Sequence, residues 1–377
     1  MDKTYIFSGP GRTEISGNHT DHQRGCVLAG AVDLETRAEV SLNGTDIIRV
    51  FSDGFSPVEV SLSDLYPRRE DCNTTKALVR GVAAAFDQRG AKLQGVDAVV
   101  HSTVLPGSGL SSSAAFEVLF GTIFNELFFD KKLSAVEIAQ IGQYAENVYF
   151  GKPSGLMDQM ASSVGGMVFI DFENPDAPYV EKLDFDFAKA GHALCIIDSG
   201  ADHAELTDEY AAVTRELKEI CSCFGKEVLR EISEEDFINN IPALRGKVSD
   251  RALLRAIHFY RENARVRKQV EALKNNDFEK FLELVSESGR SSWMYLQNIT
   301  PAGAVEHQDM AVALSLCDLF LQRKGAFRVH GGGFAGTVQA FVPLDMLDTF
   351  KAKIEAVLGE GKCHVLSIRS QGGIRVQ

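Results

Sequence analysis

The sequence has no excess of positive charge and no long apolar run. Its 377 residues include 39 Lys and Arg against 52 Asp and Glu, which gives a formal net charge of −13 at pH 7. Proteins that bind nucleic acid without regard to sequence need a basic surface, so this composition argues against that class and against binding to an anionic membrane. No window approaches the roughly 18–20 uninterrupted apolar residues of a transmembrane helix. We therefore predict no nucleic-acid partner and no membrane span.

Cysteine pairs and a targeting segment are also missing. The seven cysteines are odd in number, none lies in a Cys-x-x-Cys pair, and the opening residues MDKTYIFSGPG contain no apolar signal-peptide core. Thiols without a disulfide framework are typical of the reducing cytoplasm. We expect a cytoplasmic protein with reduced cysteines.

Two common motifs of nucleotide-binding proteins and hydrolases do not occur. The chain contains no GxxxxGK[ST], which excludes a Walker A loop, and no GxSxG, which excludes a nucleophile elbow. The run Gly331–Gly336 formally matches GxGxxG, but a strand-like TVQAFV follows where a dinucleotide-binding fold requires a helix. The VAIK, HRD and DFG elements of a protein kinase are missing as well. We interpret this run as a glycine-rich turn between two strands.

The chain does have a globular composition, and its pattern changes along its length. Hydrophobic residues make up 45% and charged residues 24%, and a chain of 377 residues suggests about two domains. Apolar periodicity predicts strands and helices mixed in the first half, then a Pro-, Asp- and Asn-rich segment at 171–187. Residues 207–324 are predicted to be nearly all helical, and a small sheet closes the chain. We predict an α+β fold with an N-terminal domain at 1–185 and a C-terminal domain at 186–377.

The predicted elements of this pattern are as follows. The strands are expected at Tyr5–Ser8, Val27–Val40, Ile47–Phe51, Val58–Leu62, Val96–Val104, Met167–Phe172, Leu194–Asp198, Ala326–His330, Thr337–Val342 and His364–Ile368. The helices of the first half are expected at Thr75–Gln88, Ser112–Leu127 and Ser134–Phe150, with a further helix after Pro153. Ser134 and Glu137 have the spacing of a capping box.

A loop rich in glycine and serine is the strongest local signal. It reads LPGSGLSSSAA over 105–115, with a predicted strand before it and an apolar helix after it. Glycine allows close approach of the backbone, and the first N–H groups of a helix have no partner within the helix, so such a junction can hold phosphate groups. The alternative interpretation is an ordinary Gly/Ser loop with a serine N-cap.

Two further clusters carry charged side chains. The first reads GPGRTEISGNHTDH over 9–22 and places Arg, Asn, His and Asp at the edge of a strand, a donor and acceptor pattern suited to a sugar. In the second, GKPSGLMDQ over 151–159, Asp158 lies among apolar residues just inside a helix. A carboxylate in that position is either a partner of the helix dipole or a catalytic base.

Taken in this order, the motifs resemble those of the galactokinases, within the GHMP kinase superfamily. That family has GR-x-N-x-I-G-E-H-T-D-Y near its start, then P-x-G-x-G-L-S-S-S-A-A, then A-E…G-x-P-x-G-I-M-D-Q, and a late T-G-A-G-F-G-G. The resemblance covers residues 8–340, and LSSSAA and GLMDQ are its most specific parts. It implies a two-domain α+β kinase with its active site in the cleft between the domains.

The resemblance also implies an activity, which is the phosphorylation of galactose at its anomeric hydroxyl with ATP and Mg²⁺. It assigns the nucleotide phosphates to Gly107, Ser108, Gly109, Leu110, Ser111, Ser112 and Ser113, and Mg²⁺ to Ser113 and Glu146. It assigns the sugar to Asn18, His19, Asp21, Gly155 and Tyr210. Asp158 would be the base or an anionic anchor with Arg12 beside it, and Arg12 would lower the pKa of Asp158 and stabilise the transferred phosphoryl group. We expect a monomer or a weak homodimer whose partners are the sugar and ATP.

Departures from the family pattern gather at the sugar end. They are Glu14 for Asn, Asn18 for Glu, His22 for Tyr, Ser154 for Cys, Asp202-His203 for Arg-His, His330 for Thr and Ala335 for Gly. The family acid at position 18 faces the C6 side of the sugar. An amide there can still bind a hydroxyl, but unlike a carboxylate it does not repel a C6 carboxylate. Galacturonate or another modified galacto-sugar is therefore an alternative substrate.

Two other functions stay open at this point. Some galactokinase relatives act as sugar sensors without catalysis, although a sensor has no need of an intact Asp158, Arg12 and phosphate loop. A kinase of mevalonate or homoserine would share the superfamily, but the HTD element and GLMDQ disfavour it.

Overall fold

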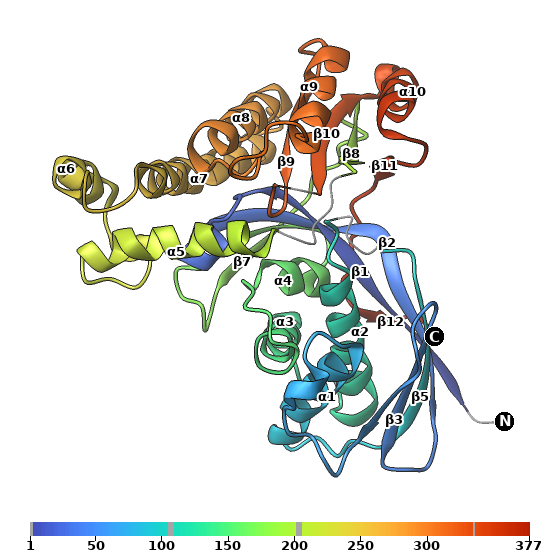
Figure 1. Cartoon of the computed structure of the whole chain (residues 1–377). Helices are drawn as coiled ribbons and strands as arrows, with labels where there is room; N and C mark the ends of the chain where they lie inside the picture. Colours follow the sequence, from blue (N-terminus) through green and yellow to red (C-terminus); the bar gives the residue numbers. More distant parts are fainter. Residues whose placement is uncertain (1–2, 105–108, 201–205, 335) are drawn as a thin grey trace.

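The computed structural model describes residues 3–104, 109–200, 206–334 and 336–377, and these build two β-sheets flanked by helices. Figure 1 shows a half that carries helices α1–α4 and a second half that carries helices α5–α10. The long strands β1 and β2 run through the middle of the molecule between them. The predicted α+β fold is confirmed.

The larger sheet has eight strands in the described part of the chain. Its main path is β12-β1-β2-β5-β3-β4, and β6 joins it by pairing with β2 and β7. The strands are β1 (Thr4–Ser16), β2 (Cys26–Leu42), β3 (Ile47–Ser52), β4 (Val58–Ser61), β5 (Val96–Ser102), β6 (Met167–Asp171), β7 (Tyr179–Leu183) and β12 (Ile374–Arg375). Strands β3 and β5 pair in parallel, whereas the other pairs described are antiparallel.

Strand β1 is longer than predicted and carries much of the polar cluster at 9–22. The prediction ended this strand at Ser8, but pairing with β2 continues to Ser16. The register shifts between Pro10 and Arg12 and again between Glu14 and Ser16. Such irregularities bend a strand and redirect its side chains, which is how a strand can present a functional residue such as Arg12.

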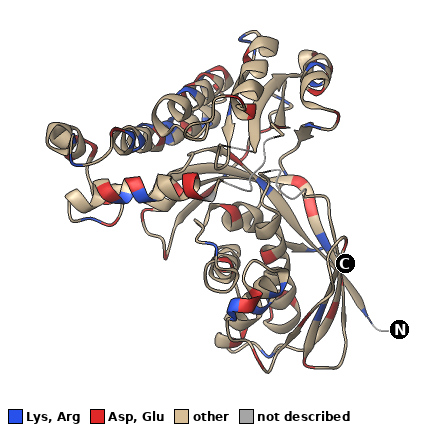
Figure 2. Ribbon diagram, viewed as in Figure 1, with Lys and Arg blue, Asp and Glu red and all other residues tan. Residues whose placement is uncertain are grey.

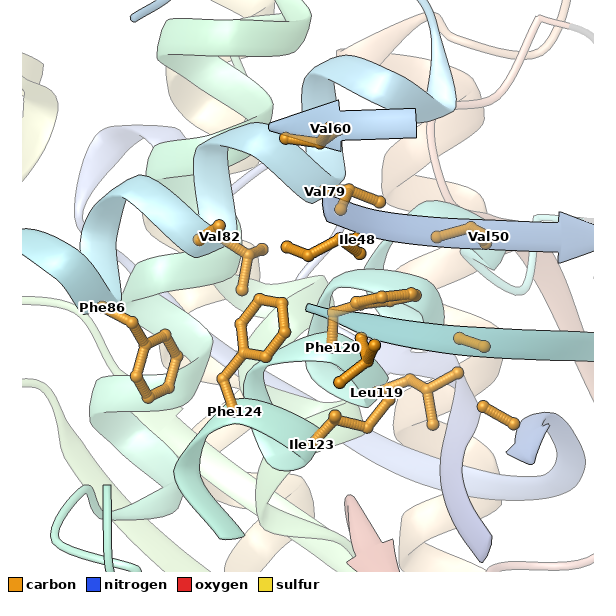
Figure 3. Close-up of a cluster of buried hydrophobic side chains, with 14 of the residues drawn as sticks. Ile48, Val50, Val60, Val79, Val82, Phe86, Leu119, Phe120, Ile123 and Phe124 are labelled. Atoms are coloured by element: carbon orange, nitrogen blue, oxygen red, sulfur yellow. The ribbon is translucent and has the colours of Figure 1, made fainter. Parts of the chain in front are cut away.

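Four helices cover the larger sheet. They are α1 (Thr75–Gln88), α2 (Ser112–Phe128), α3 (Ala135–Tyr144) and α4 (Met157–Val164), with a π-helical turn η3 (Ala145–Phe150) after α3. The predicted capping box at the start of α3 is confirmed, because Ser134 and Glu137 bond reciprocally. Phe86, Phe120 and Phe124 form edge-to-face pairs against Ile48 and other apolar side chains of the sheet (Figure 3). This core fixes the position at which α2 begins.

The smaller sheet has the order β11-β8-β10-β9 and is joined by the helical segments that the sequence predicts. Its strands are β8 (His192–Asp198), β9 (Ala326–His330), β10 (Thr337–Pro343) and β11 (Cys363–Leu366). The helices are α5 (Thr207–Cys223), α6 (Glu234–Leu244), α7 (Asp250–Lys274), α8 (Phe278–Ser291), α9 (Asp309–Leu321) and α10 (Leu347–Leu358). The single-turn elements are η1 (Asp21–Gln23), η2 (Arg69–Asp71), η4 (Leu229–Glu231), η5 (Ser292–Leu296) and η6 (Leu344–Met346).

The path between the two sheets differs from the prediction at two places. Strand β7 forms inside the Pro-, Asp- and Asn-rich segment, where no separate strand was predicted, and it extends the larger sheet beside β6. The last described segment returns to the larger sheet, where β12 pairs with β1 at Phe7 and Ser8. The region after β11 therefore contacts both halves of the molecule.

The distribution of charged residues and the state of the cysteines agree with the expectations from composition. Figure 2 shows acidic and basic residues interspersed on the helices of both halves. All seven cysteines belong to the described residues and are free thiols. No helix in the described ranges combines the length and apolar character needed to cross a membrane.

Candidate functional site

An ion pair between Arg12 and Asp158 lies at the centre of the site. Arg12 comes from β1 and Asp158 from the first turn of α4, and the guanidinium donates from Nε and Nη2 to the two carboxylate oxygens at 2.7 Å each. The Arg12 side chain is almost fully buried, whereas 27% of the Asp158 side chain is exposed. Burial raises the pKa of Asp158, but the charge of Arg12 and hydrogen bonds from Arg12 and Ser111 outweigh it and lower the pKa to about 2. Asp158 is therefore ionised and reachable from solvent.

The same arginine holds the serine-rich loop in place. Its backbone N–H donates to the carbonyl of Leu110 at 3.0 Å, and its guanidinium contacts the carbonyl of Gly109 and the hydroxyl of Ser111. Ser111 is the N-cap of α2 with a left-handed φ of 54°, and its hydroxyl bonds to Asp158. The open N–H groups at the start of α2 thus lie next to the Arg12–Asp158 pair, as phosphate binding requires. Gly107 and Ser108 lie outside the described residues.

The predicted metal ligands are brought together. Ser113 on α2 donates from its hydroxyl to Oε1 of Glu146, which lies in η3, at 3.2 Å. Two hard oxygen donors suit Mg²⁺, which in proteins is held by one or two carboxylates together with phosphate oxygens and water. The residues present therefore fit a magnesium ion that arrives with a nucleotide.

A buried amide fixes the orientation of Glu146. Gln159 follows Asp158 in α4, is fully buried, and donates from Nε2 to Glu146 at 2.8 Å and to Glu117 at 2.9 Å. Burial, followed by the negative charge of Glu146, raises the pKa of Glu117 well above its usual value. The neighbouring residues Asp158 and Gln159 thus connect the ion pair to Glu146.

The sugar-binding residues expected around Asp21 lie beside Gly155. Oδ1 of Asp21 accepts the backbone N–H of His22 at 2.9 Å, and Oδ2 lies so close to Gly155 that a Cβ there would overlap it. Burial, with the negative charge of Asp158 next in size, raises the pKa of Asp21 to about 6. The two carboxylates of the site therefore have well-separated pKa values.

Two histidines complete this side of the site. Nε2 of His19 lies 2.9 Å from the carbonyl of Gly332, and Nδ1 lies 3.3 Å from Nε2 of His22. The carbonyl can only accept, so Nε2 of His19 carries the proton and Nδ1 accepts from His22. Burial lowers the pKa of His19 to about 3 and that of His22 to about 4, so both rings are neutral at pH 7.

The glycine turn between β9 and β10 contacts His19 and Tyr210. The prediction of a turn between two strands is confirmed for the described residues of the run, since β9 ends at His330 and β10 begins at Thr337. Tyr210 of α5 donates to the carbonyl of Gly333 at 2.9 Å, and a Cβ on Gly332 would overlap its ring. Tyr210 therefore contacts the glycine turn directly.

Asn18 does not reach the open side of the site. Its side chain is fully buried, and its amide donates to the carbonyl of Gly331 at 2.5 Å and to Glu14 at 3.1 Å. Its Oδ1 accepts from Asn298 at 2.8 Å and lies 3.4 Å from the hydroxyl of Ser292. The Asn18 side chain therefore makes all of these hydrogen bonds with other parts of the protein, and its contact with a sugar stays a prediction.

The family departures at 14 and 330 belong to the same buried network. Glu14 accepts from Arg328 of β9 at 2.5 Å, and both side chains are buried. Nε2 of His330 accepts the backbone N–H of Glu14 at 3.2 Å, so its proton is on Nδ1, which donates to Thr337 at 2.8 Å. Burial lowers the pKa of His330 well below its usual value. These residues join β1 of the larger sheet to β9 and β10 of the smaller one.

Sequence reasoning missed three residues of this site. Gln159 and Lys152 lie inside the motif GKPSGLMDQ, which could have drawn attention to them. The motif did not, however, indicate that they contact Glu146. Arg328 stands on a predicted strand far from any motif, and nothing in its local sequence pointed to Glu14. A cavity of about 1130 Å³ between α8, α9 and β9 includes Arg328 in its lining but none of the predicted site residues.

Comparisons with known proteins agree with the geometry. A family model described as GHMP kinases N terminal domain matches residues 77–166, and one described as galactokinase galactose-binding signature matches residues 1–42. A galactokinase of Glaesserella parasuis serovar 5 is 31% identical over 355 residues, which cover 92% of this chain and 87% of that protein. A galactokinase of Haemophilus influenzae strain PittEE is 33% identical over 353 residues, with 91% and 86% covered.

Solved structures share the fold. A Lactococcus lactis galactokinase, solved with galactose, superimposes with a TM-score of 0.84 at 24% identity and covers 99% of this chain and 95% of its own. A mevalonate kinase superimposes with a TM-score of 0.67 at 15% identity, with 97% and 99% covered. Both show that this chain has the fold of these kinases, and the galactokinase is the more similar of the two.

Proposed function

The chain belongs to the galactokinase family within the GHMP kinase superfamily, and we propose that it transfers the γ-phosphoryl group of ATP to the anomeric hydroxyl of galactose. The observation that carries this proposal is the bidentate Arg12–Asp158 pair beside the start of α2. It places an ionised carboxylate, a buried cation and a phosphate-binding helix terminus in one site. A sugar sensor that does not catalyse transfer would need none of these groups.

Asp158 is the group that faces the nucleophile. Phosphoryl transfer has a loose transition state, so the attacking hydroxyl needs orientation more than strong activation. The ionised carboxylate accepts a hydrogen bond from the anomeric hydroxyl and takes its proton as the bond to phosphorus forms. Arg12 keeps Asp158 ionised and lends positive charge to the transferred group, whose equatorial oxygens share the negative charge.

The nucleotide is held at the other side of the pair. The backbone around Gly109–Ser113 binds the phosphates, with Ser113 and Glu146 as the residues that hold Mg²⁺. The ion, when bound, neutralises charge on the phosphate oxygens. The net charge of −13 gives no general attraction for ATP, so these local groups carry the whole recognition of phosphate.

Galactose is the favoured sugar. Asp21 lies against Gly155, and His19 and Tyr210 contact the neighbouring residues Gly332 and Gly333. An ionised Asp21 can accept hydrogen bonds from two neighbouring ring hydroxyls. The amide of Asn18 is enclosed by protein, so it offers no direct discrimination at C6. No observation therefore favours galacturonate over galactose.

A coupled assay of ADP release tests the proposal on galactose, galacturonate, N-acetylgalactosamine, glucose and arabinose. We expect the highest kcat/KM with galactose, and ADP release that requires both sugar and Mg²⁺. A higher kcat/KM with galacturonate would reassign the substrate. Absence of ADP release with every sugar, in protein that binds galactose, would point to the sensor function.

The variant Asp158→Asn tests the role of the carboxylate. Removing the proton acceptor and its charge should lower kcat by about 10²-fold or more, while nucleotide binding is retained. Calorimetry with an ATP analogue measures the second part. Asp130→Asn, which changes an aspartate that is 89% exposed, is the matched control and should keep full activity. Full turnover by Asp158→Asn would remove both roles from this residue.

A further inference from the structure

A lysine contacts the same oxygen of Glu146 as Ser113, the other residue that is expected to hold the metal. Nζ of Lys152 lies 3.2 Å from Oε1 of Glu146, and the hydroxyl of Ser113 bonds to that same oxygen at 3.2 Å. The other oxygen of Glu146 accepts from Ser154 at 2.6 Å and from Gln159 at 2.8 Å. Oε1 is therefore the oxygen with an exchangeable partner, since Lys152 alone among these donors is a long, flexible cation.

The backbone of Lys152 is anchored while its side chain stays open to solvent. Its N–H donates to the carbonyl of Glu146 at 3.1 Å, next to Gly151 in a left-handed conformation with φ of 86°. The Lys152 side chain is 59% exposed, against 3% for Glu146. The anchored backbone thus keeps the ammonium group near the metal ligand, and the exposed stem leaves it free to turn toward a ligand in the site.

Lys152 is also within range of the reacting end of the site. Gln159, the residue that follows Asp158 in α4, donates to the same carboxylate of Glu146 that pairs with Lys152. Arg12 is fully engaged with Asp158 and the serine-rich loop. Of these two cations, Lys152 is the one that would lose its carboxylate partner, because a metal ion bound to Glu146 would replace it.

We propose that Lys152 is a phosphate-binding residue that pairs with Glu146 in the free enzyme and transfers its contact to a terminal phosphate oxygen when the magnesium nucleotide binds. The exchange keeps each charge paired in both states. An ammonium group on a flexible stem suits this role, because it can follow a phosphate oxygen over several ångströms. The proposal rests on the proposed use of a magnesium nucleotide, but not on the identity of the sugar.

The test measures ligand binding rather than turnover. Calorimetry gives the affinity of wild type, Lys152→Met and Lys152→Arg for the magnesium complexes of ADP and of a non-hydrolysable ATP analogue. Lys152→Met should weaken the ATP analogue about tenfold or more and ADP less, because a charge-assisted contact to the terminal phosphate is lost. Lys152→Arg should restore part of the affinity.

A second measurement follows Mn²⁺ binding without nucleotide, by electron paramagnetic resonance. Lys152→Met should bind Mn²⁺ at least as tightly as wild type, because the variant lacks the ammonium group that competes with the metal for Glu146. Lys131→Met is the matched control, because Lys131 also pairs with a carboxylate, Glu126 at 2.9 Å, and is 67% exposed. Its affinities for metal and nucleotide should equal those of wild type.

Two results would overturn the proposal. One is an unchanged affinity of Lys152→Met for the ATP analogue, which would leave Lys152 as a solvated counterion. The other is a parallel weakening of Mn²⁺, ADP and the ATP analogue, which would mean that Lys152 only supports the position of Glu146. Thermal unfolding confirms that each variant is folded. Because sugar is absent from these measurements, failure of galactose phosphorylation would leave the result readable.

Discussion

Two carboxylates near the reacting centre differ in pKa because their surroundings differ. Asp158 has a bidentate cation and a hydroxyl donor, so its charge is stabilised although most of its side chain is covered. Asp21 has one backbone donor and lies near the charge of Asp158, so its proton is held more strongly. Under the proposed function, this separation would make Asp158 the ionised anchor and Asp21 the sugar-binding carboxylate that titrates.

We predict that galactose binding depends on the ionisation of Asp21. Below its pKa of about 6 the carboxylate is protonated and can accept fewer hydrogen bonds from sugar hydroxyls. The Kd for galactose should therefore fall about tenfold as the pH rises from 5 to 7 and then level off. His19 and His22 have pKa values of about 3 and 4, so they do not change charge in this range. Calorimetric titration at a series of pH values measures the effect.

The variant Asp21→Asn supplies the control for this dependence. It should bind galactose more weakly than wild type at pH 7, with a Kd that no longer changes between pH 5 and 7. Asp158 has a pKa of about 2 and stays ionised, so kcat at saturating sugar should change little over the same interval. A pH-dependent Kd that persists in Asp21→Asn would assign the titration to another group.

The sequence was most informative where neighbouring residues carry the function. The spacing within LSSSAA and GLMDQ predicted that Ser113 and Asp158 lie at the first turns of two helices, and both do. Asn18 could not be placed in this way. Its orientation depends on Gly331 and Asn298, about 300 residues away, and one strand longer than predicted carries Glu14 to Arg328. Distant partners of this kind leave no local pattern.

At the scale of elements, β1 and β9 are joined by the buried pair of Glu14 and Arg328, and Glu14 departs from the family pattern. The galactokinase motif quoted above has Asn at position 14 and Glu at 18, whereas this chain has the reverse. Here Glu14 receives Arg328, and Asn18 donates to both Glu14 and the carbonyl of Gly331. The carboxylate and the amide have exchanged places within one hydrogen-bonded pair.

We predict that Asn18→Glu alone is strongly destabilising and that Glu14→Asn partly rescues it. The single change places a second buried carboxylate against Glu14 and a carbonyl, which should cost about 3–5 kcal/mol in the free energy of unfolding. The double variant removes the repulsion and restores the family order. Urea unfolding of the two single variants and the double variant should give a coupling free energy of about 1–3 kcal/mol. Additive effects would mean that the two positions do not act as a pair.

At the scale of the whole molecule, the segment after β11 fastens the smaller sheet to the larger one. The backbone N–H of Arg369 donates to the carbonyl of Ala31 at 2.9 Å, and its carbonyl accepts from the N–H of Gly166 at 2.8 Å. Its side chain pairs with Glu35 at 2.7 Å. Beyond it, β12 adds to the edge of β1. Because β1 also carries Arg12, the packing of this last segment supports the strand on which the site is built.

The closest packing of that segment is at Gly372, which predicts a stability effect far from the site. Its position is buried, and a Cβ there would overlap the backbone of Ser163 at the end of α4. Gly372→Ala should lower the free energy of unfolding by about 1–3 kcal/mol, because neither backbone can move aside without loosening α4 or β12. Chemical denaturation measures this, and the adjacent exposed Gln371→Ala is the control, with an expected change within about 0.5 kcal/mol. Since α4 also carries Asp158, Gly372→Ala should reduce kcat more than it raises the KM for ATP, whereas unchanged stability would show that the segment is docked only loosely.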